Sequence, residues 1–213
     1  MLAGSVNSSR VTLQKLIQHE MNITGVMGLS PGKSENVSGY QDLKAISESN
    51  DLEFTYFENI NDPRTVSFVK EREPDLLFVV GLSQLVKQTL LHIPKYGCVG
   101  FHPTKLPKGR GRGAVAWLVM DKAPGASTFF LLDEGMDSGP VIAQQPFTIS
   151  EMDYASDVIK KIIGSIEKAL DNTLPELKKG ILPVTEQDHS QATYLGRRRP
   201  EDGLIDWSQS AKE

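Results

Sequence analysis

Short apolar runs alternate with amphipathic stretches over the first half of the chain. Strands are predicted at Leu2-Ala3 and at 23–29, 53–57, 76–80 and 98–101. The run 76–80 is continuously apolar, which is typical of a strand buried on both faces of a parallel sheet.

Helices are predicted between these strands. Leu13, Leu16 and Ile17 follow the spacing i, i+3, i+4 and mark one face of a helix. Asp62-Pro63 is typical of a helix start, with Asp as the N-cap and Pro in the first turn. Weaker helical patterns cover 40–49 and 85–91. The alternation predicts an α/β fold, a Rossmann-like, mostly parallel sheet flanked by helices.

The second half of the chain has a different pattern. Apolar runs at 127–132 and 141–147 predict two strands of a long hairpin, and 154–174 predicts a long amphipathic helix. After Pro183 the apolar pattern fades. We therefore expect a Rossmann-like catalytic domain over 1–183. An extended linker over 184–213 would lead toward a C-terminal domain that is absent or truncated.

The composition is that of an ordinary globular protein. The chain has 213 residues, of which 39% are hydrophobic and 23% charged, and this length suits one large domain. A net charge of −4 argues against nucleic-acid binding as its main function. We find no secretory signal and no apolar run near the roughly 20 residues that span a bilayer, so we expect a cytoplasmic protein.

The single cysteine, Cys98, lies in a predicted buried strand. One cysteine excludes an intrachain disulfide and a cysteine-based metal site. Apolar surroundings raise the pKa of a thiol, so Cys98 is a poor candidate nucleophile.

Two predicted strands end in Gly/Pro-rich loops that carry a titratable residue. His102 follows the strand 98–101, and Asp137 lies between the strands 127–132 and 141–147. Open α/β sheets carry their chemistry beyond the carboxyl ends of the strands, so His102 is a candidate acid/base. Each residue also has a structural interpretation, because a histidine after a strand is often only a hydrogen-bonding residue and Asp-Ser-Gly is a good turn.

Other motifs give weaker signals. The loop Gly4–Ser9 precedes a helix and offers amides to an anion, but it lacks the G-x-G-x-x-G of dinucleotide sites. The stretch 28–34 resembles a P-loop, but Met27 stands where the first glycine is required, so nucleotide hydrolysis is rejected. The remaining histidines have no metal-ligand spacing, and we expect no metal.

The loop after His102 is basic and rich in glycine. It carries Lys105, Lys108, Arg110 and Arg112. Such a loop is either a solvated segment, an RNA contact of the Arg/Gly type, or a site for an anionic group of a substrate or cofactor, which arginine recognises well. Its position next to His102 favours the last interpretation.

Taken together, these motifs resemble those of the folate-dependent formyltransferases, a family that includes glycinamide ribonucleotide, methionyl-tRNA and nucleotide-sugar N-formyltransferases. The hallmark of that family is Asn-x-His, a Leu-Pro-x-x-Arg-Gly loop and a downstream Asp-x-Gly. This chain has Gly100-Phe101-His102, Leu106-Pro107-Lys108-Gly109-Arg110-Gly111 and Asp137-Ser138-Gly139. The resemblance spans most of the chain and is densest from Leu76 to Gln144.

The resemblance implies a set of site residues. His102, Asp137 and Gly100 would stand at the catalytic positions. The formyl donor would be 10-formyltetrahydrofolate, held by Gln84, Leu85, Val86, Arg112, Asp133, Glu134, Gly135 and Met136. The amine substrate would meet Lys105, Arg110 and Ser8.

Gly100 departs from the family pattern because an asparagine is expected there. Losing one donor to the oxyanion typically costs about 10²–10³ in rate. The resemblance implies an N-formyltransferase, and a catalytically weak or inactive relative that binds folate or a nucleotide is the alternative that Gly100 leaves open. Thr104 and the backbone of Gly100 are candidate substitutes for the missing donor.

The tail bears on the acceptor. The segments 191–196 and 197–207 resemble the region that joins the two domains of nucleotide-sugar formyltransferases, which favours an amino sugar nucleotide as the amine. A methionyl-tRNA formyltransferase is less favoured, because the chain is acidic. The expected partner is a small, nucleotide-linked amine, and a homodimer is compatible with the sequence. Binding to nucleic acid or to a membrane is not expected.

Overall fold

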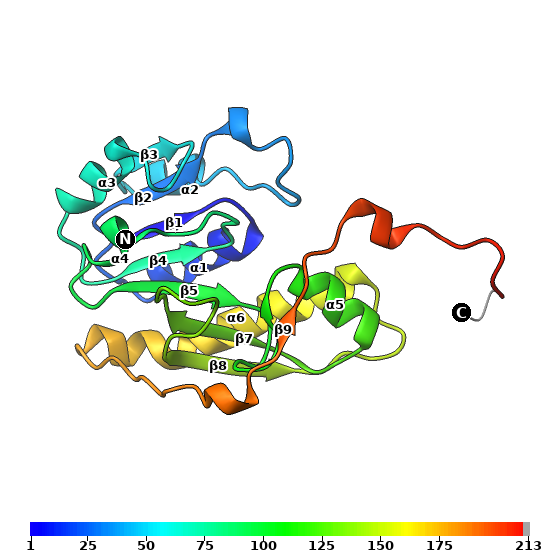
Figure 1. Ribbon diagram of the computed structural model, residues 1–213. Helices are drawn as coiled ribbons and strands as arrows, with labels where there is room; N and C mark the ends of the chain where they lie inside the picture. The colour runs from blue at the N-terminus through cyan, green and yellow to red at the C-terminus, as the bar shows by residue number, and fades with distance from the viewer. Residues whose placement is uncertain (211–213) are drawn as a thin grey trace.

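The computed structural model describes residues 1–210 and contains a seven-stranded sheet within them (Figure 1). The strand order is β3-β2-β1-β4-β5-β7-β8. The bounds are β1 Leu2–Gly4, β2 Val26–Leu29, β3 Phe54–Phe57, β4 Leu77–Val80, β5 Cys98–His102, β7 Gly125–Leu131 and β8 Val141–Phe147. The first five strands run parallel, whereas β7 pairs antiparallel with both β5 and β8. The predicted mostly parallel, Rossmann-like sheet and the 127–147 hairpin are both confirmed.

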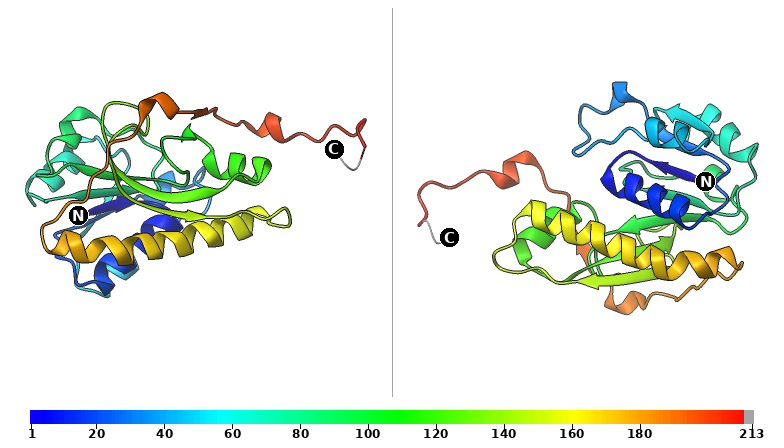
Figure 2. Two further views of the ribbon diagram at one scale, coloured as in Figure 1. Left: turned by 90° about the horizontal axis from the view of Figure 1, so that it is seen from below. Right: turned by 180° about the vertical axis from the view of Figure 1, so that it is seen from behind.

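Helices cover both faces of the sheet. The bounds are α1 Asn7–Gln18, α2 Lys44–Glu48, α3 Pro63–Lys70, α4 Gln88–Leu91, α5 Ala114–Asp121 and α6 Ala155–Lys178. One hydrophobic core lies beneath α1 and α6, which lie side by side in front of the sheet in the rear view of Figure 2. A second core lies on the opposite face, beneath α3 and α4. Within residues 1–210, none of the helices has the length and apolar character needed to cross a membrane.

Two predicted helices are shorter than the pattern suggested. The helix expected over 40–49 is reduced to α2, because Tyr40 pairs with Val6 and donates its hydroxyl to the carbonyl of Leu29 at 2.9 Å. The helix expected over 85–91 is reduced to α4. Asn61 holds the preceding turn extended, because its side chain accepts from the amide of Lys87 and donates to the carbonyl of Leu85.

A second, two-stranded sheet lies outside the main one. It pairs β6 (Arg110–Gly111), in the basic loop, with β9 (Tyr194–Leu195), in parallel. Thr185 also bridges to Val141 at the edge of the main sheet. Residues 185–195 thus lie against the α/β domain as a strap, whereas the sequence suggested a linker from 184 onward. Arg198 still lies 5.3 Å over the ring of Trp117 in α5, and the last described segment, in red, extends away from the domain (Figure 1).

Candidate active site

His102 is the last residue of β5 and lies at the carboxyl end of the parallel strands. Its side chain is buried, with 8% exposed. Nε2 lies 2.7 Å from the carbonyl oxygen of Gly109, at the far end of the loop that follows β5. Because a carbonyl oxygen only accepts, Nε2 carries a hydrogen in this arrangement. Nδ1 is therefore the ring nitrogen that remains to gain or lose a proton.

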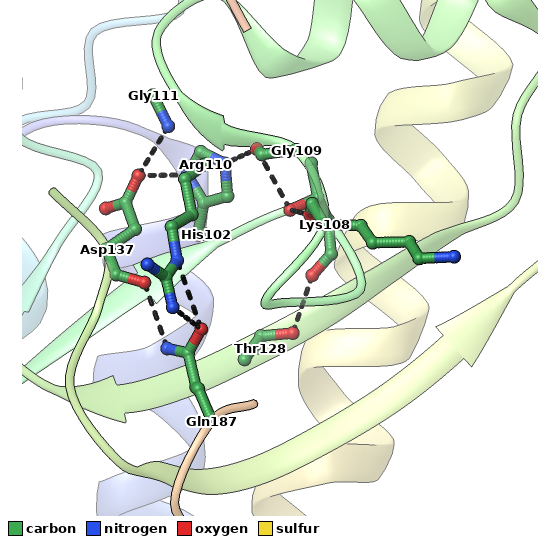
Figure 3. Close-up of polar contacts among 9 residues, drawn as sticks. His102, Lys108, Gly109, Arg110, Gly111, Thr128, Asp137 and Gln187 are labelled. Carbon is green, nitrogen blue, oxygen red and sulfur yellow. Dashed lines mark hydrogen bonds and ion pairs between the residues drawn. The ribbon is translucent and has the colours of Figure 1, made fainter. Parts of the chain in front are cut away.

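Asp137 faces that nitrogen. Its Oδ2 lies 3.6 Å from Nδ1 of His102, and the same oxygen accepts the amide of Gly111 at 2.8 Å (Figure 3). The structure thus brings together two residues that are 35 positions apart in the sequence. The carboxylate thus faces Nδ1, whereas Nε2 faces the carbonyl of Gly109.

The loop between β5 and β6 is folded by its own polar groups. Thr104 is buried and donates its hydroxyl to the carbonyl of Lys108 at 2.8 Å and to that of Gly109 at 3.2 Å. Thr128 of β7 donates to the carbonyl of Thr104 at 2.7 Å. The Thr104 hydroxyl is therefore used inside the loop and is not directed at a reacting group, contrary to the suggestion that it replaces the missing asparagine.

Gly100 lies two residues before His102 on the same face of β5. A Cβ added there would lie 2.4 Å from Cδ2 of Leu132 and 3.1 Å from Cζ of Phe130. Glycine within a strand often marks such a close approach. The space beside Gly100 is thus filled by apolar side chains, and no side-chain amide stands there.

Two loops expected to hold the folate lie against each other. Gln88, at the start of α4, donates to the carboxylate of Glu134. Within these loops, Leu85 and Met136 are exposed, with 78% and 55% of their surface accessible, whereas Val86 is buried. Arg112 donates to the carbonyl of Ser83 at 3.3 Å and so connects the basic loop to this pair.

Side chains within these loops serve mainly to shape the backbone. Gln84 turns away and bonds the backbone of Glu58 and Ile60 at 2.8 and 2.7 Å. Asp133 accepts the amide of Gly135 and the hydroxyl of Ser138. The side chains of Gln84 and Asp133 are thus engaged within the protein, as are the Leu85 carbonyl, which accepts from Asn61, and the Gly135 amide.

The three residues expected to meet the substrate are placed differently from one another. Lys105 is exposed. Ser8 lies in the first turn of α1 beside the turn at Gly81, where an added Cβ would come within 2.7 Å of its hydroxyl. Arg110 is 2% exposed, and its guanidinium bonds Gln187 at 2.7 Å and Nδ1 of His189 at 3.1 Å. The structure thus uses Arg110 to hold the strap, where the sequence suggested a substrate contact.

Cys98 is fully buried in β5. Burial raises the pKa of its thiol to about 12, so the thiol stays protonated, as its apolar setting in the sequence indicated. Within residues 1–210, no group of three or more His, Cys, Asp or Glu side chains is arranged to hold a metal ion.

This chain belongs to the formyl transferase family, whose sequence profile matches residues 5–174. It is thus an enzyme that transfers a formyl group. The resemblance inferred from the sequence motifs is confirmed.

Similar proteins within the family have different acceptors. Methionyl-tRNA formyltransferase of Thermotoga maritima is 27% identical over 98% of this chain and 68% of its own length. An N-formyltransferase of Helicobacter canadensis, solved with folinic acid and dTDP-3-aminofucose, has a TM-score of 0.71 at 16% identity, over 99% of this chain and 75% of that one. Phosphoribosylglycinamide formyltransferase of Bacillus halodurans has a TM-score of 0.69 at 22% identity, over 83% and 93%. These two structures share the fold of this chain.

Proposed function

We propose that this enzyme transfers the formyl group of 10-formyltetrahydrofolate to a primary amine, and that the amine is carried by an amino sugar nucleotide. The observation that carries the proposal is the pair of buried His102 and half-buried Asp137, 3.6 Å apart at the carboxyl end of β5, in a chain of the formyl transferase family.

The chemistry fits the pair. The amine nitrogen attacks the formyl carbon to give a tetrahedral intermediate, and the bond from that carbon to the folate nitrogen then breaks. A proton must leave the amine and another must reach the folate nitrogen. His102 serves as the acid/base at Nδ1, a role typically worth 10²–10⁴-fold in rate. Asp137 stabilises the imidazolium that forms.

The donor would bind at the two loops 84–86 and 133–136, whose flanks are joined by the contact between Gln88 and Glu134. Backbone polar groups of 84–86 and 133–136, other than the Leu85 carbonyl and the Gly135 amide that the protein itself engages, would bind the edge of a flat pterin ring. Exposed Leu85 and Met136 would contact its faces. Arg112, which lies between the basic loop and Ser83, would meet a carboxylate of the folate. Flat rings bound between apolar side chains with a few polar groups are common in small-molecule sites.

The acceptor is supported by two observations. The tail segment 191–207 resembles the corresponding segment of nucleotide-sugar formyltransferases, and one structure of the same fold contains dTDP-3-aminofucose. We test it with three acceptors: an amino sugar nucleotide, glycinamide ribonucleotide and methionyl-tRNA. Faster turnover of methionyl-tRNA, with binding that weakens steeply with salt, would overturn the acceptor assignment.

The role of His102 is tested separately. His102→Ala should lower turnover by about 10²–10⁴-fold, measured at a temperature at which circular dichroism shows the variant to be folded. A variant that keeps wild-type turnover would refute the acid/base assignment.

A second function is favoured by the surroundings of Gly100. Because Leu132 and Phe130 fill the space beside it, the site has no amide donor at this position, and a folate-binding protein of weak turnover is the alternative. Calorimetric titration with a stable tetrahydrofolate analogue separates the cases. Micromolar binding without turnover of any acceptor favours the alternative, and absence of binding contradicts both.

A further inference from the structure

Gln187 lies in the strap, 50 residues after Asp137, yet its side chain is buried beneath the candidate site. Only 6% of Gln187 is exposed. Its Oε1 accepts from the guanidinium of Arg110 at 2.7 and 3.2 Å. Its Nε2 donates to the backbone carbonyls of Asp137, at 2.9 Å, and Gly139, at 2.7 Å (Figure 3). Both hydrogens and the carbonyl oxygen of the amide are therefore engaged.

Asp137 depends on contacts from outside its own loop. Its φ is +50°, in the left-handed region that is uncommon for residues other than glycine. Its neighbours on the N-terminal side, Glu134 to Met136, are exposed. The backbone carbonyl of Asp137 is held by Gln187 and its carboxylate by the amide of Gly111. The amide of Gly111 belongs to the basic loop, and Gln187 belongs to the strap.

Three consecutive residues connect these contacts. The carbonyl of Gly109 bonds His102, the side chain of Arg110 bonds Gln187, and the amide of Gly111 bonds Asp137. The pairing of β6 with β9 fixes this tripeptide to the strap. The position of the carboxylate relative to the imidazole is thus set jointly by the tripeptide and by the amide of Gln187.

We propose that Gln187 is a positioning residue, whose amide clamps the backbone of Asp137 and so holds its carboxylate opposite Nδ1 of His102. It does not touch the reacting groups and acts only through Asp137. The expected effect on the rate of formyl transfer rests on the proposed function. The effect on the position of the Asp137 carboxylate is measurable without any substrate.

The test uses the full chain and two variants of Gln187. Gln187→Glu keeps an acceptor for Arg110 but loses both bonds donated to the carbonyls of Asp137 and Gly139. Gln187→Leu loses all four. Gln191 supplies the matched control, because it lies in the same strap, is exposed, and its side-chain amide donates to the carboxylate of Asp188. Gln191→Glu and Gln191→Leu therefore repeat both changes away from the site.

The first readout is the amide resonance of Gly111 in ¹H–¹⁵N spectra of the protein without ligands, because this amide donates to the carboxylate of Asp137. We expect it to shift in both Gln187 variants and to keep its place in both Gln191 variants. An unshifted Gly111 resonance in folded Gln187→Glu would overturn the proposal. The Gly111 resonance can be measured even if no acceptor is formylated. The test of Gln187 is therefore independent of the test of formyl transfer.

The second readout is steady-state formyl transfer at a temperature well below the unfolding midpoint. We expect kcat of Gln187→Glu to fall by at least about tenfold, with KM values for donor and amine changed by less than about threefold. A purely structural role would lower the unfolding midpoint and leave kcat of the folded fraction unchanged, and that result would also overturn the proposal.

Discussion

Replacing Gly100 with asparagine provides the sharpest test of how the site is packed. The new Cβ would lie 2.4 Å from Cδ2 of Leu132 and 3.1 Å from Cζ of Phe130. The closest atom is the end of a flexible, half-buried side chain, so Leu132 must leave its position. Overpacking of this kind typically costs about 1–3 kcal/mol, and we expect Gly100→Asn to lower the free energy of unfolding by that amount.

A second substitution should relieve the collision. Leu132→Ala removes the obstructing atoms at a cost that we place near 2 kcal/mol, the low end for leucine truncation, because Leu132 is half-buried. In the double variant Gly100→Asn/Leu132→Ala the two losses should not add. We expect a coupling free energy of at least about 1 kcal/mol, as is usual for residues in contact.

The assays are urea unfolding followed by circular dichroism, and formyl transfer. Gly100→Ala, alone and with Leu132→Ala, is the matched control, because it adds the Cβ without the amide. If the amide supplies a missing oxyanion donor, the asparagine double variant should turn over faster than the alanine double variant, by up to about 10²-fold. Additive losses within about 0.3 kcal/mol, or a Gly100→Asn variant as stable as the wild type, would refute the packing argument.

Three further predictions concern stability. Burial raises the pKa of the Cys98 thiol from 9.0 to about 12, so between these values the unfolded chain loses a proton that the folded one keeps. The free energy of unfolding of the wild type, minus that of Cys98→Ala, should thus fall by about 1.4 kcal/mol per pH unit above pH 9. If this difference stays constant in urea titrations from pH 8 to 11, the prediction is contradicted. Arg110→Lys should lose about 1–3 kcal/mol in the same assay, because an ammonium does not reproduce the forked contact with Gln187, and a loss under 0.5 kcal/mol would speak against a holding role. The hydroxyl of Ser9 accepts hydrogen bonds from the amides of Ser5 and Val6 and donates one to the carbonyl of Val80. Ser9→Ala should therefore lower the free energy of unfolding by about 1–3 kcal/mol and the thermal midpoint by several degrees. The control Ser34→Ala, at an exposed turn, should leave the midpoint unchanged.

Most of the main sheet is predictable from the sequence because its strands are buried and therefore continuously apolar. β4 and β5 are the clearest examples, and the 3.6-residue periodicity of α6 is as clear. The shortened helices α2 and α4 are not predictable in this way. They are limited by contacts of Tyr40 and Asn61 with distant backbone, which override local helical preference.

The candidate site is predictable in part. His102 and Asp137 were found because each follows a strand and matches a family motif, and the sheet then brings them together. The role of Arg110 was missed because a basic loop usually faces solvent, whereas this guanidinium is buried by a segment 77 residues away. Gln187 gave no signal, since a glutamine in a polar stretch has no periodicity that marks it as buried.

The strap has a consequence for the order in which the protein is built. The two hydrophobic cores are complete once Leu182 is included, but the loops that hold His102 and Asp137 are bonded to residues 187–195. These contacts join segments 48 to 84 residues apart, and the strap is the later segment in each. During synthesis the domain would therefore fold first and acquire an ordered site last, once the strap has emerged from the ribosome. A shortened chain that ends at residue 183 should accordingly unfold cooperatively and yet show no formyl transfer. In this protein, the segment needed for catalysis would then differ from the segment needed for folding.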